Sequence, residues 1–252
     1  MKNISLFISS RGSKGLYQLI FLSYSIFIIL MIGSIYYKGN LGSLFLVIAC
    51  LFFVISKRIQ AMALKNLLLK QLNLKEYQLY FQKLPNYWFF RSLKPQKLLA
   101  SINVNGLRGD KEAFEKDKED FRDKRIAIRN KDRYLAYFEL MSKSTDDKVA
   151  LREKYQRLVP SGNYFSVIGI EDRVATAVFK IRHLQEPTDY FDHYVPKNRL
   201  DNIQTQHLRM LNEQNKGDIE KAKTFAQSIM NEPDELYMVR EAKEFYEKTY
   251  KM

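Results

Sequence analysis

The residues that could support metal or acid–base chemistry are few, and three of them lie in one short stretch, DYFDHYV. Asp189 and His193 would share a helix face at i and i+4, with Asp192 beside them, an arrangement that metal ligands can adopt. No second pair of ligands lies nearby in the sequence, so a solvated helix edge is favoured and we expect no metal site. The chain also lacks the HExxH, GxSxG and CxxC motifs and a glycine-rich phosphate loop. We therefore expect a protein without catalytic residues or cofactor, and keep as the alternative an enzyme whose unfamiliar site uses these three residues.

A single cysteine limits the covalent and metal chemistry further. Cys50 has no second cysteine with which to form an intramolecular disulfide, and it excludes a cysteine-based zinc cluster. It lies inside an apolar run, where a small apolar filler is the expected role.

The net charge of +13 is confined to the first part of the chain. Residues 1–108 contain fourteen Lys and Arg but one acid, Glu76, whereas residues 109–252 contain equal numbers of basic and acidic side chains. A surface for nucleic acid would combine basic and aromatic groups, and only the stretch from Tyr87 to Arg91 offers both. We expect no nucleic-acid partner.

Two uncharged runs near the N-terminus are long and apolar. The first extends from Gly15 to Tyr37 and the second from Leu41 to Ser56. At 1.5 Å per residue, a helix of about 20 residues crosses a hydrocarbon core of about 30 Å. The pattern predicts transmembrane helices at about 16–37 and 41–56, within a membrane anchor at 1–58; buried core helices and a cleaved signal peptide are the less favoured alternatives.

Basic residues flank the two runs asymmetrically. Lys2, Arg11 and Lys14 precede the first run and only Lys38 lies between the two. Four more follow the second run: Lys57, Arg58, Lys65 and Lys70. The positive-inside rule then places both termini in the cytoplasm, with the hairpin in the plasma (inner) membrane. The four following residues are candidates for contact with anionic lipid head groups, and a role in topology alone is the alternative.

Downstream of the anchor, helical patterns recur in pairs joined by short polar turns. The turns fall near residues 73, 109, 145, 186 and 217, about 31 to 41 residues apart. Residues able to cap a helix, such as Asp110 and Asp218, follow these turns. Spacing in this range is typical of helix-turn-helix repeat proteins.

The best copy of the pattern contains Gly217, Asp218, Ala222 and Pro233, and a second copy contains Thr145, Asp146, Ala150 and Pro160. Over roughly 61–250 the chain thereby resembles the tetratricopeptide repeat family. It departs from the family in lacking most of the small residues midway along the first helices, and in the irregular connection at 158–173. The resemblance implies an all-α solenoid of about five helix pairs in a cytoplasmic domain at 59–252; a generic helical bundle is the alternative.

One helix of this series carries a polar, basic stripe. The stripe consists of Lys97, Ser101, Asn105 and Arg108, at steps of 4, 4 and 3 residues. In tetratricopeptide-like proteins the first helix of each pair lines a concave groove, so the resemblance makes the stripe a candidate for binding a partner, together with Tyr134, Tyr137, Gln206 and Arg209 on later first helices. An ordinary solvated face is the alternative for each of these residues.

These features predict a membrane-tethered, non-catalytic adaptor whose helical domain binds a protein or peptide. Tethering would raise the effective concentration of a partner that is itself at the membrane. The alternative is a membrane-active accessory protein (immunity, transport-accessory or lipid-organising) in which the hairpin is the functional element. The sequence identifies neither the partner nor the oligomeric state.

Overall fold

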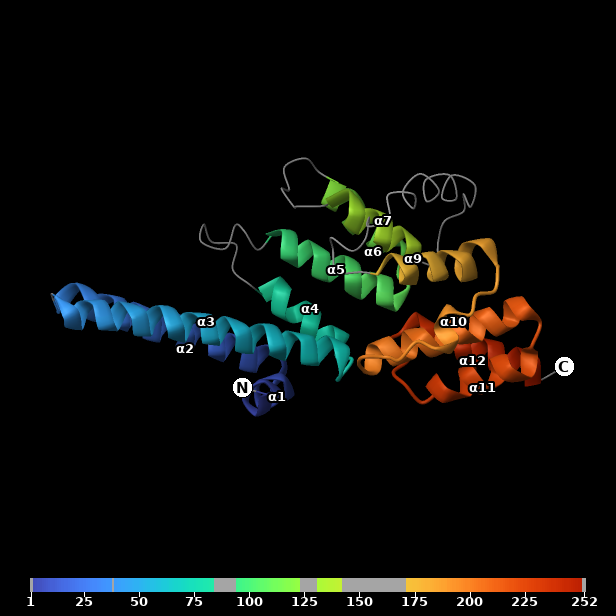
Figure 1. Ribbon diagram of the computed structural model, residues 1–252, viewed down its shortest axis with the longest axis horizontal. Helices are drawn as coiled ribbons and strands as arrows, with labels where there is room; N and C mark the ends of the chain where they lie inside the picture. The colour runs from blue at the N-terminus through green and yellow to red at the C-terminus, as the bar shows by residue number, and fades with distance from the viewer. Residues whose placement is uncertain (1, 38, 84–93, 123–130, 142–170, 251–252) are drawn as a thin grey trace. The chain divides into compact units, whose positions relative to one another are not determined.

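The computed structural model describes residues 2–37, 39–83, 94–122, 131–141 and 171–250, and every regular element in these ranges is a helix (Figure 1). The chain divides into two compact units. We call Met1–Pro85 the N-terminal unit and Asn86–Met252 the C-terminal unit. The all-α prediction is confirmed for the described residues.

The N-terminal unit is a long helical hairpin with a short helix at each end of its sequence. Its elements are α1 (Lys2–Ser10), α2 (Gly12–Tyr36), α3 (Asn40–Leu69) and α4 (Leu74–Lys83). Helices α2 and α3 pack lengthwise against each other (Figure 1), with the rings of Phe27 and Phe53 5.2 Å apart. α1 and α4 both pack near the open end of the hairpin, where α2 begins and α3 ends.

The turn at the closed end of the hairpin depends on glycine. A Cβ atom on Gly42 would lie 2.0 Å from the carbonyl oxygen of Tyr37 and 2.8 Å from that of Ser34. Since no side chain tolerates such distances to backbone atoms, α3 can start this close to the end of α2 only with glycine at position 42.

Both predicted apolar runs form helices that are long and apolar enough to cross a membrane. Only 6% of the most apolar stretch of α2 and 17% of that of α3 is buried, whereas a core helix of a soluble protein is mostly buried. The second helix is longer than predicted, because α3 continues past Ser56 to Leu69. The domain boundary expected at residue 58 therefore falls inside a continuous helix, and the compact unit extends to Pro85.

The only acidic residue among the first 108 accepts a hydrogen bond from a backbone N–H group at the start of α2. Glu76 on α4 accepts a hydrogen bond at Oε2 from the backbone N–H of Ser13, at 2.7 Å. The first N–H groups of a helix have no partner within the helix, and a carboxylate there is also favoured by the helix dipole. Gly12 (φ +62°) makes the approach possible, because a Cβ atom there would lie 2.6 Å from the same Oε2.

A second contact between α2 and α4 lies one turn further along. The Tyr17 hydroxyl donates to the carbonyl oxygens of Leu79 and Tyr80, and the rings of Tyr17 and Tyr80 stack at 5.7 Å. Together with the Glu76 hydrogen bond, this contact attaches α4 to the first turns of α2.

In the residues that the structure describes, the regular elements of the C-terminal unit are helices and helical turns. They are α5 (Lys94–Arg108), α6 (Lys111–Arg122), α7 (Lys131–Met141), α9 (Asp172–Phe179), the π-helical turn η4 (Lys180–Leu184), the 3-10 turn η5 (Tyr190–Asp192), α10 (Arg199–Lys216), α11 (Ile219–Ile229) and α12 (Tyr237–Tyr250). One hydrophobic cluster joins α5, α6 and α7 around Phe114, Phe121 and Phe138. Another joins α9, η4, η5 and α10 around Ile181 and Phe191.

Two predicted turns are confirmed in detail. Gly109 and Gly217 adopt the left-handed conformation, with φ of +67° and +82°. The next residue caps the following helix in each case: Asp110 accepts from the N–H of Ala113 and Asp218 from the N–H of Lys221. The turn expected near 145 and most of the connection at 158–173 lie outside the described residues.

One predicted helix is wrong. The stretch from Thr188 to Pro196 forms only the single 3-10 turn η5. The side-chain amide of Asn212 on α10 accepts from the N–H of Thr188 at 2.8 Å and donates to the Thr188 carbonyl at 2.9 Å. These bonds hold the segment in a conformation that lets Phe191 enter the core. Hydrogen bonds to a side chain thus take the place of the backbone hydrogen bonds that a helix would form.

We expect the replacement Glu76→Gln to loosen the start of α2. Losing a charged hydrogen bond costs about 1.5 kcal/mol or more, which corresponds to roughly tenfold faster amide exchange from Gly12 to Gly15. Hydrogen–deuterium exchange of the full chain in detergent micelles measures this rate. The control is Lys75→Gln, which removes an exposed charge next to Glu76; equal exchange in the two variants would contradict the capping role.

The same interaction predicts a pH dependence. The hydrogen bond from Ser13 holds the pKa of Glu76 below its ordinary value of 4.5, so the ionised carboxylate stabilises the fold above that value. The stabilisation is lost as the pH falls through the lowered pKa. The difference in exchange between the wild type and Glu76→Gln should therefore be constant near neutral pH and shrink below 4.5. A difference that persists at the lowest pH would argue against an ionised cap.

Candidate functional site

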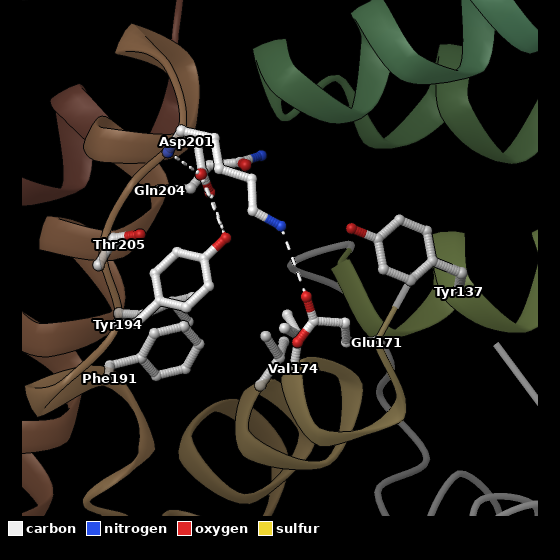
Figure 2. A pocket seen from close by; sticks show the side chains of 11 residues that line it. Tyr137, Glu171, Val174, Phe191, Tyr194, Asp201, Gln204 and Thr205 are labelled. Atoms are coloured by element: carbon white, nitrogen blue, oxygen red, sulfur yellow. Dashed lines mark hydrogen bonds and ion pairs between the residues drawn. The ribbon is translucent and has the colours of Figure 1, made fainter. Parts of the chain in front are cut away.

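A pocket of about 160 Å³ opens in the C-terminal unit, between α7, α9 and α10. Figure 2 shows side chains from these elements converging on it. Its lining combines apolar, tyrosine, carboxylate and amide groups: Tyr137, Glu171, Val174, Val178, Phe191, Tyr194, Lys197, Asp201, Gln204, Thr205 and Leu208.

The apolar part of the pocket belongs to the core beside it. Val178, Phe191 and Leu208 are buried and form part of the cluster that joins α9 to α10. Val174 is half-buried on α9 and packs against the same cluster. The pocket thus has a firm apolar wall, and its polar groups lie on the remaining sides.

Asp201 organises one polar side. Asn198 caps α10 by accepting from the N–H of Asp201 at 3.0 Å, which fixes the backbone there. The Asp201 carboxylate then accepts from the Tyr194 hydroxyl, at 3.2 and 3.1 Å, and from the N–H of Lys197, at 2.7 Å (Figure 2). Burial, and next the Asp201 charge, raise the pKa of Tyr194 to about 12, so Tyr194 stays a neutral donor at physiological pH.

The other polar side carries an ion pair at the surface. Lys197 Nζ lies 3.4 Å from Oε1 of Glu171 (Figure 2), and the Tyr190 hydroxyl donates to Oε2 at 3.4 Å. Both members of the pair are largely exposed, at 70% and 60%. Exposed pairs of this kind contribute little stability, so another cation could replace the Lys197 ammonium at small cost.

The chemistry of the lining favours a positively charged guest. Two carboxylates face one lysine, and tyrosine rings can receive a cation on their faces. The phenol of Tyr137, with a pKa raised by burial to about 12, is neutral and points toward the same space (Figure 2). The pocket can therefore hold an ammonium or guanidinium group on a slender apolar stem.

Two residues of the stripe predicted on α5, Asn105 and Arg108, have partners inside the C-terminal unit. Asn105 is buried, and its side-chain amide donates to Oδ2 of Asp117 on α6 at 2.8 Å. It also reaches Oγ of Ser101 at 3.5 Å. The Arg108 guanidinium lies 3.7 Å from Glu235, and Lys97 is half-buried. Asn105 thus joins α5 to α6, and the ligand role expected for it stays a prediction.

The later candidates have different positions. Tyr134 packs on the hydrophobic cluster of α5 to α7, with its ring 6.3 Å from that of Phe138. Gln206 donates to Oδ1 of Asn202 at 3.4 Å. Arg209 donates to the carbonyl oxygens of Phe191 and Tyr194, at 2.8 and 3.1 Å. Arg209 thus fixes the η5 segment, and the ligand role expected for it stays a prediction.

Of the eight predicted partner-binding residues, Tyr137 alone lines the pocket. Sequence reasoning missed Glu171, Tyr194, Lys197 and Asp201. A local signal existed for Asp201, because Asn198 and Asp201 have the spacing of a helix N-cap. No local signal brings Glu171 next to Lys197, since that approach follows from the packing of α9 on α10.

The prediction that no metal binds concerns the segment that contains Asp189, Asp192 and His193. Asp192 Oδ2 lies 3.6 Å from Nζ of Lys216, so this carboxylate has an ion-pair partner. Within the described ranges, no group of three or more His, Cys, Asp or Glu side chains is arranged to hold a metal ion. The absence of catalytic activity stays a prediction.

The four predicted lipid-contact residues are all exposed in the N-terminal unit. Lys57, Arg58 and Lys65 lie on the last turns of α3, and Lys70 is its C-cap residue. The Lys57 ammonium lies 5.3 Å from the ring centroid of Tyr24 and 5.3 Å from that of Phe53, so its stem lies along an aromatic surface. Lys65 and Lys70 thus lie at the open end of the hairpin, whereas Lys57 lies beside Tyr24, midway along α2.

Comparison of the chain with family models, curated proteins and solved structures finds no match. The tetratricopeptide-like superhelix accordingly stays a prediction. The function has to be argued from the sites of this chain itself.

We expect Arg209→Ala to destabilise the C-terminal unit by about 1–3 kcal/mol, because two carbonyl oxygens lose their donor. The loss of unfolding free energy for Asn105→Ala should fall in the same range, because this change leaves Asp117 without that donor. Urea unfolding of the full chain in detergent, followed by circular dichroism, measures the change. Lys180→Ala, at an exposed position, is the control and should stay within about 0.5 kcal/mol of wild type. A normally stable Arg209→Ala that loses a bound partner would support the ligand role.

Proposed function

We propose that the chain is a membrane-tethered adaptor whose C-terminal unit binds a basic side chain of a protein or peptide partner. The hairpin of α2 and α3 spans the plasma membrane, and both termini face the cytoplasm. The observation that carries the proposal is the pocket of about 160 Å³ with two carboxylates and tyrosine rings around an apolar wall.

The membrane assignment is supported by the surface of α2 and α3. Side chains such as Phe21, Ile29 and Ile32 are 76%, 66% and 61% exposed, which is unfavourable in water and favourable among lipid chains. Basic residues such as Lys65 and Lys70 lie at the open end of the hairpin, as the positive-inside rule requires of a cytoplasmic side.

The size of the pocket favours a side chain over a cofactor. Pockets for small-molecule ligands and cofactors commonly measure about 300 Å³ or more. A cavity of about 150 Å³ accepts a group the size of benzene. A pocket of about 160 Å³ therefore suits one lysine or arginine side chain of a longer segment, and tethering at the membrane would offset the modest affinity of so small a site.

The arrangement of helix pairs is part of the proposal. The pairs α5–α6 and α10–α11 each turn at a left-handed glycine followed by a capping aspartate. We interpret the C-terminal unit as a series of such pairs, similar to the tetratricopeptide arrangement, with the pocket beside the first helices α7 and α10.

One observation favours the alternative, a membrane-active accessory protein. A simple anchor needs only its two spanning helices, yet α1 and α4 both pack on the hairpin and complete a unit that reaches Pro85. Such a unit could act in the membrane, as an immunity, transport-accessory or lipid-organising protein does, with the C-terminal unit as its regulator.

The pocket can be tested by filling it. Val174→Trp places a large ring in the pocket, and Lys180→Trp places the same ring at an exposed position that does not line it. Affinity purification of the full chain in mild detergent should recover a stoichiometric partner with the wild type and Lys180→Trp, and none with Val174→Trp. Glu171→Lys should weaken the same partner by roughly tenfold, since it reverses one charge at the site.

Two other results would redirect the proposal. Loss of the partner in Lys97→Glu but not in Val174→Trp would return the site to the α5 stripe. If no sample retains a partner, the adaptor role fails and the membrane-active alternative gains.

The two functions are separated by replacing part of the hairpin. An unrelated pair of apolar spans in place of residues 25–52 keeps Glu76, Ser13, Tyr17 and Tyr80, and hence the attachment of α4. An adaptor should retain partner recovery and cellular function within about twofold, because only tethering matters. Loss of function with an intact pocket would assign the activity to the hairpin.

A further inference from the structure

Two serines of the first helix are buried, together with Ile8, whereas its other large apolar side chains are exposed. On α1, Ser5 and Ser9 are each 1% exposed. Ile4, Leu6 and Phe7 are 52%, 39% and 58% exposed. A helix on the surface of a soluble protein has the opposite polarity, so the surroundings of α1 are not water alone.

The buried serines have specific partners, which fix the rotation of the helix. Asn66 on α3 donates to Oγ of Ser5 at 3.3 Å, and Gln71 donates to Oγ of Ser9 at 3.1 Å. Turning α1 to bury Phe7 would break both hydrogen bonds. The outward direction of the apolar side chains is therefore built into the packing of α1 on α3.

The height of α1 along the hairpin matches a bilayer surface. The uncharged run of α2 begins at Gly15 and α1 ends at Ser10, five residues or about 8 Å earlier along the chain. The layer of head groups extends about 5–8 Å beyond each side of a hydrocarbon core, so α1 lies at the level of that layer. Helices that lie in a membrane surface place their apolar side chains at this depth.

The charges around α1 indicate which lipids it meets. Arg11 and Lys14 are exposed directly after α1, and the Arg11 guanidinium lies 4.5 Å from the centre of the Phe7 ring. Lys65 and Lys70 are exposed on the adjoining end of α3. The N-terminal unit has one acid, and that acid is engaged with Ser13.

We propose that α1 lies in the cytoplasmic surface of the bilayer, with Ile4 and Phe7 among the upper acyl segments and Arg11 and Lys14 against anionic phospholipid head groups. The inference rests on the proposed membrane insertion of α2 and α3. It gives the N-terminus a lipid-sensing surface in addition to its anchor, since binding of this kind depends on the content of anionic lipid.

Spin labels attached to single cysteines test the position of α1. In a Cys50→Ser background, labels at Ile4→Cys and Phe7→Cys report on α1. Ile29→Cys, midway along α2, is the lipid reference, and Lys75→Cys, exposed on α4, is the water reference. The full chain is placed at one copy per nanodisc, in phosphatidylcholine alone or with phosphatidylglycerol. Collision rates with oxygen and with a soluble nickel chelate are then measured for each label.

With phosphatidylglycerol present, we expect the oxygen-to-nickel ratio at positions 4 and 7 to exceed that at position 75 several-fold and to approach that at position 29. The ratio should fall when phosphatidylglycerol is omitted. Values at 4 and 7 equal to that at 75, with position 29 still in lipid, would overturn the placement of α1 and leave the membrane proposal intact. A high collision rate between the nickel chelate and the label at position 29 would overturn the membrane insertion itself. Equal ratios in both nanodiscs would overturn the role of the anionic head groups.

Discussion

The start of α2 imposes the constraint on which the N-terminal unit depends. An apolar helix that begins at Gly12 has backbone N–H groups without a partner inside the helix, and leaving them unpaired is costly, the more so if the helix enters a bilayer as proposed. Glu76 supplies the acceptor from another helix, 63 residues later in the chain. Because the acceptor lies on α4, the chain must turn back after α3, and this requirement explains the left-handed Leu72 (φ +57°) between the two helices.

At the same end of the hairpin, hydrogen bonds at regular intervals connect two segments that are far apart in the sequence. Hydrogen bonds connect Ser5 with Asn66, Ser9 with Gln71, Ser13 with Glu76 and Tyr17 with Tyr80, at separations of 61, 62, 63 and 63 residues. The two segments therefore run side by side in the same direction, and each changes course at a residue with positive φ, Gly12 in one and Leu72 in the other. Ser5 and Ser9 of α1 take part in these hydrogen bonds, which leaves Ile4, Leu6 and Phe7 outside.

The features that could be predicted from sequence are those determined within a few residues. The glycine turns at 109 and 217, the caps at Asp110 and Asp218 and the two apolar helices depend on local chemistry and periodicity. The features that could not be predicted depend on distant partners. Asn105 and Arg209 have the composition of a binding surface, yet Asp117 and the carbonyl oxygens of Phe191 and Tyr194 engage them internally. The pocket combines Tyr137 and Asp201, whose proximity no spacing in the sequence reveals.

The division of charge between the two units has a consequence for binding. The N-terminal unit carries a large excess of basic residues, which attracts an anionic bilayer surface, whereas residues 109–252 have no net charge. Because residues 109–252 have no net charge, the proposed anionic bilayer surface does not attract that part of the chain, and the carboxylates of Glu171 and Asp201 are not held against a like-charged surface. Basic segments of other proteins accumulate at that same surface. In the proposed function, a pocket with carboxylates and tyrosines competes with lipid for such segments, and the exposed Lys197 at its mouth keeps this competition reversible.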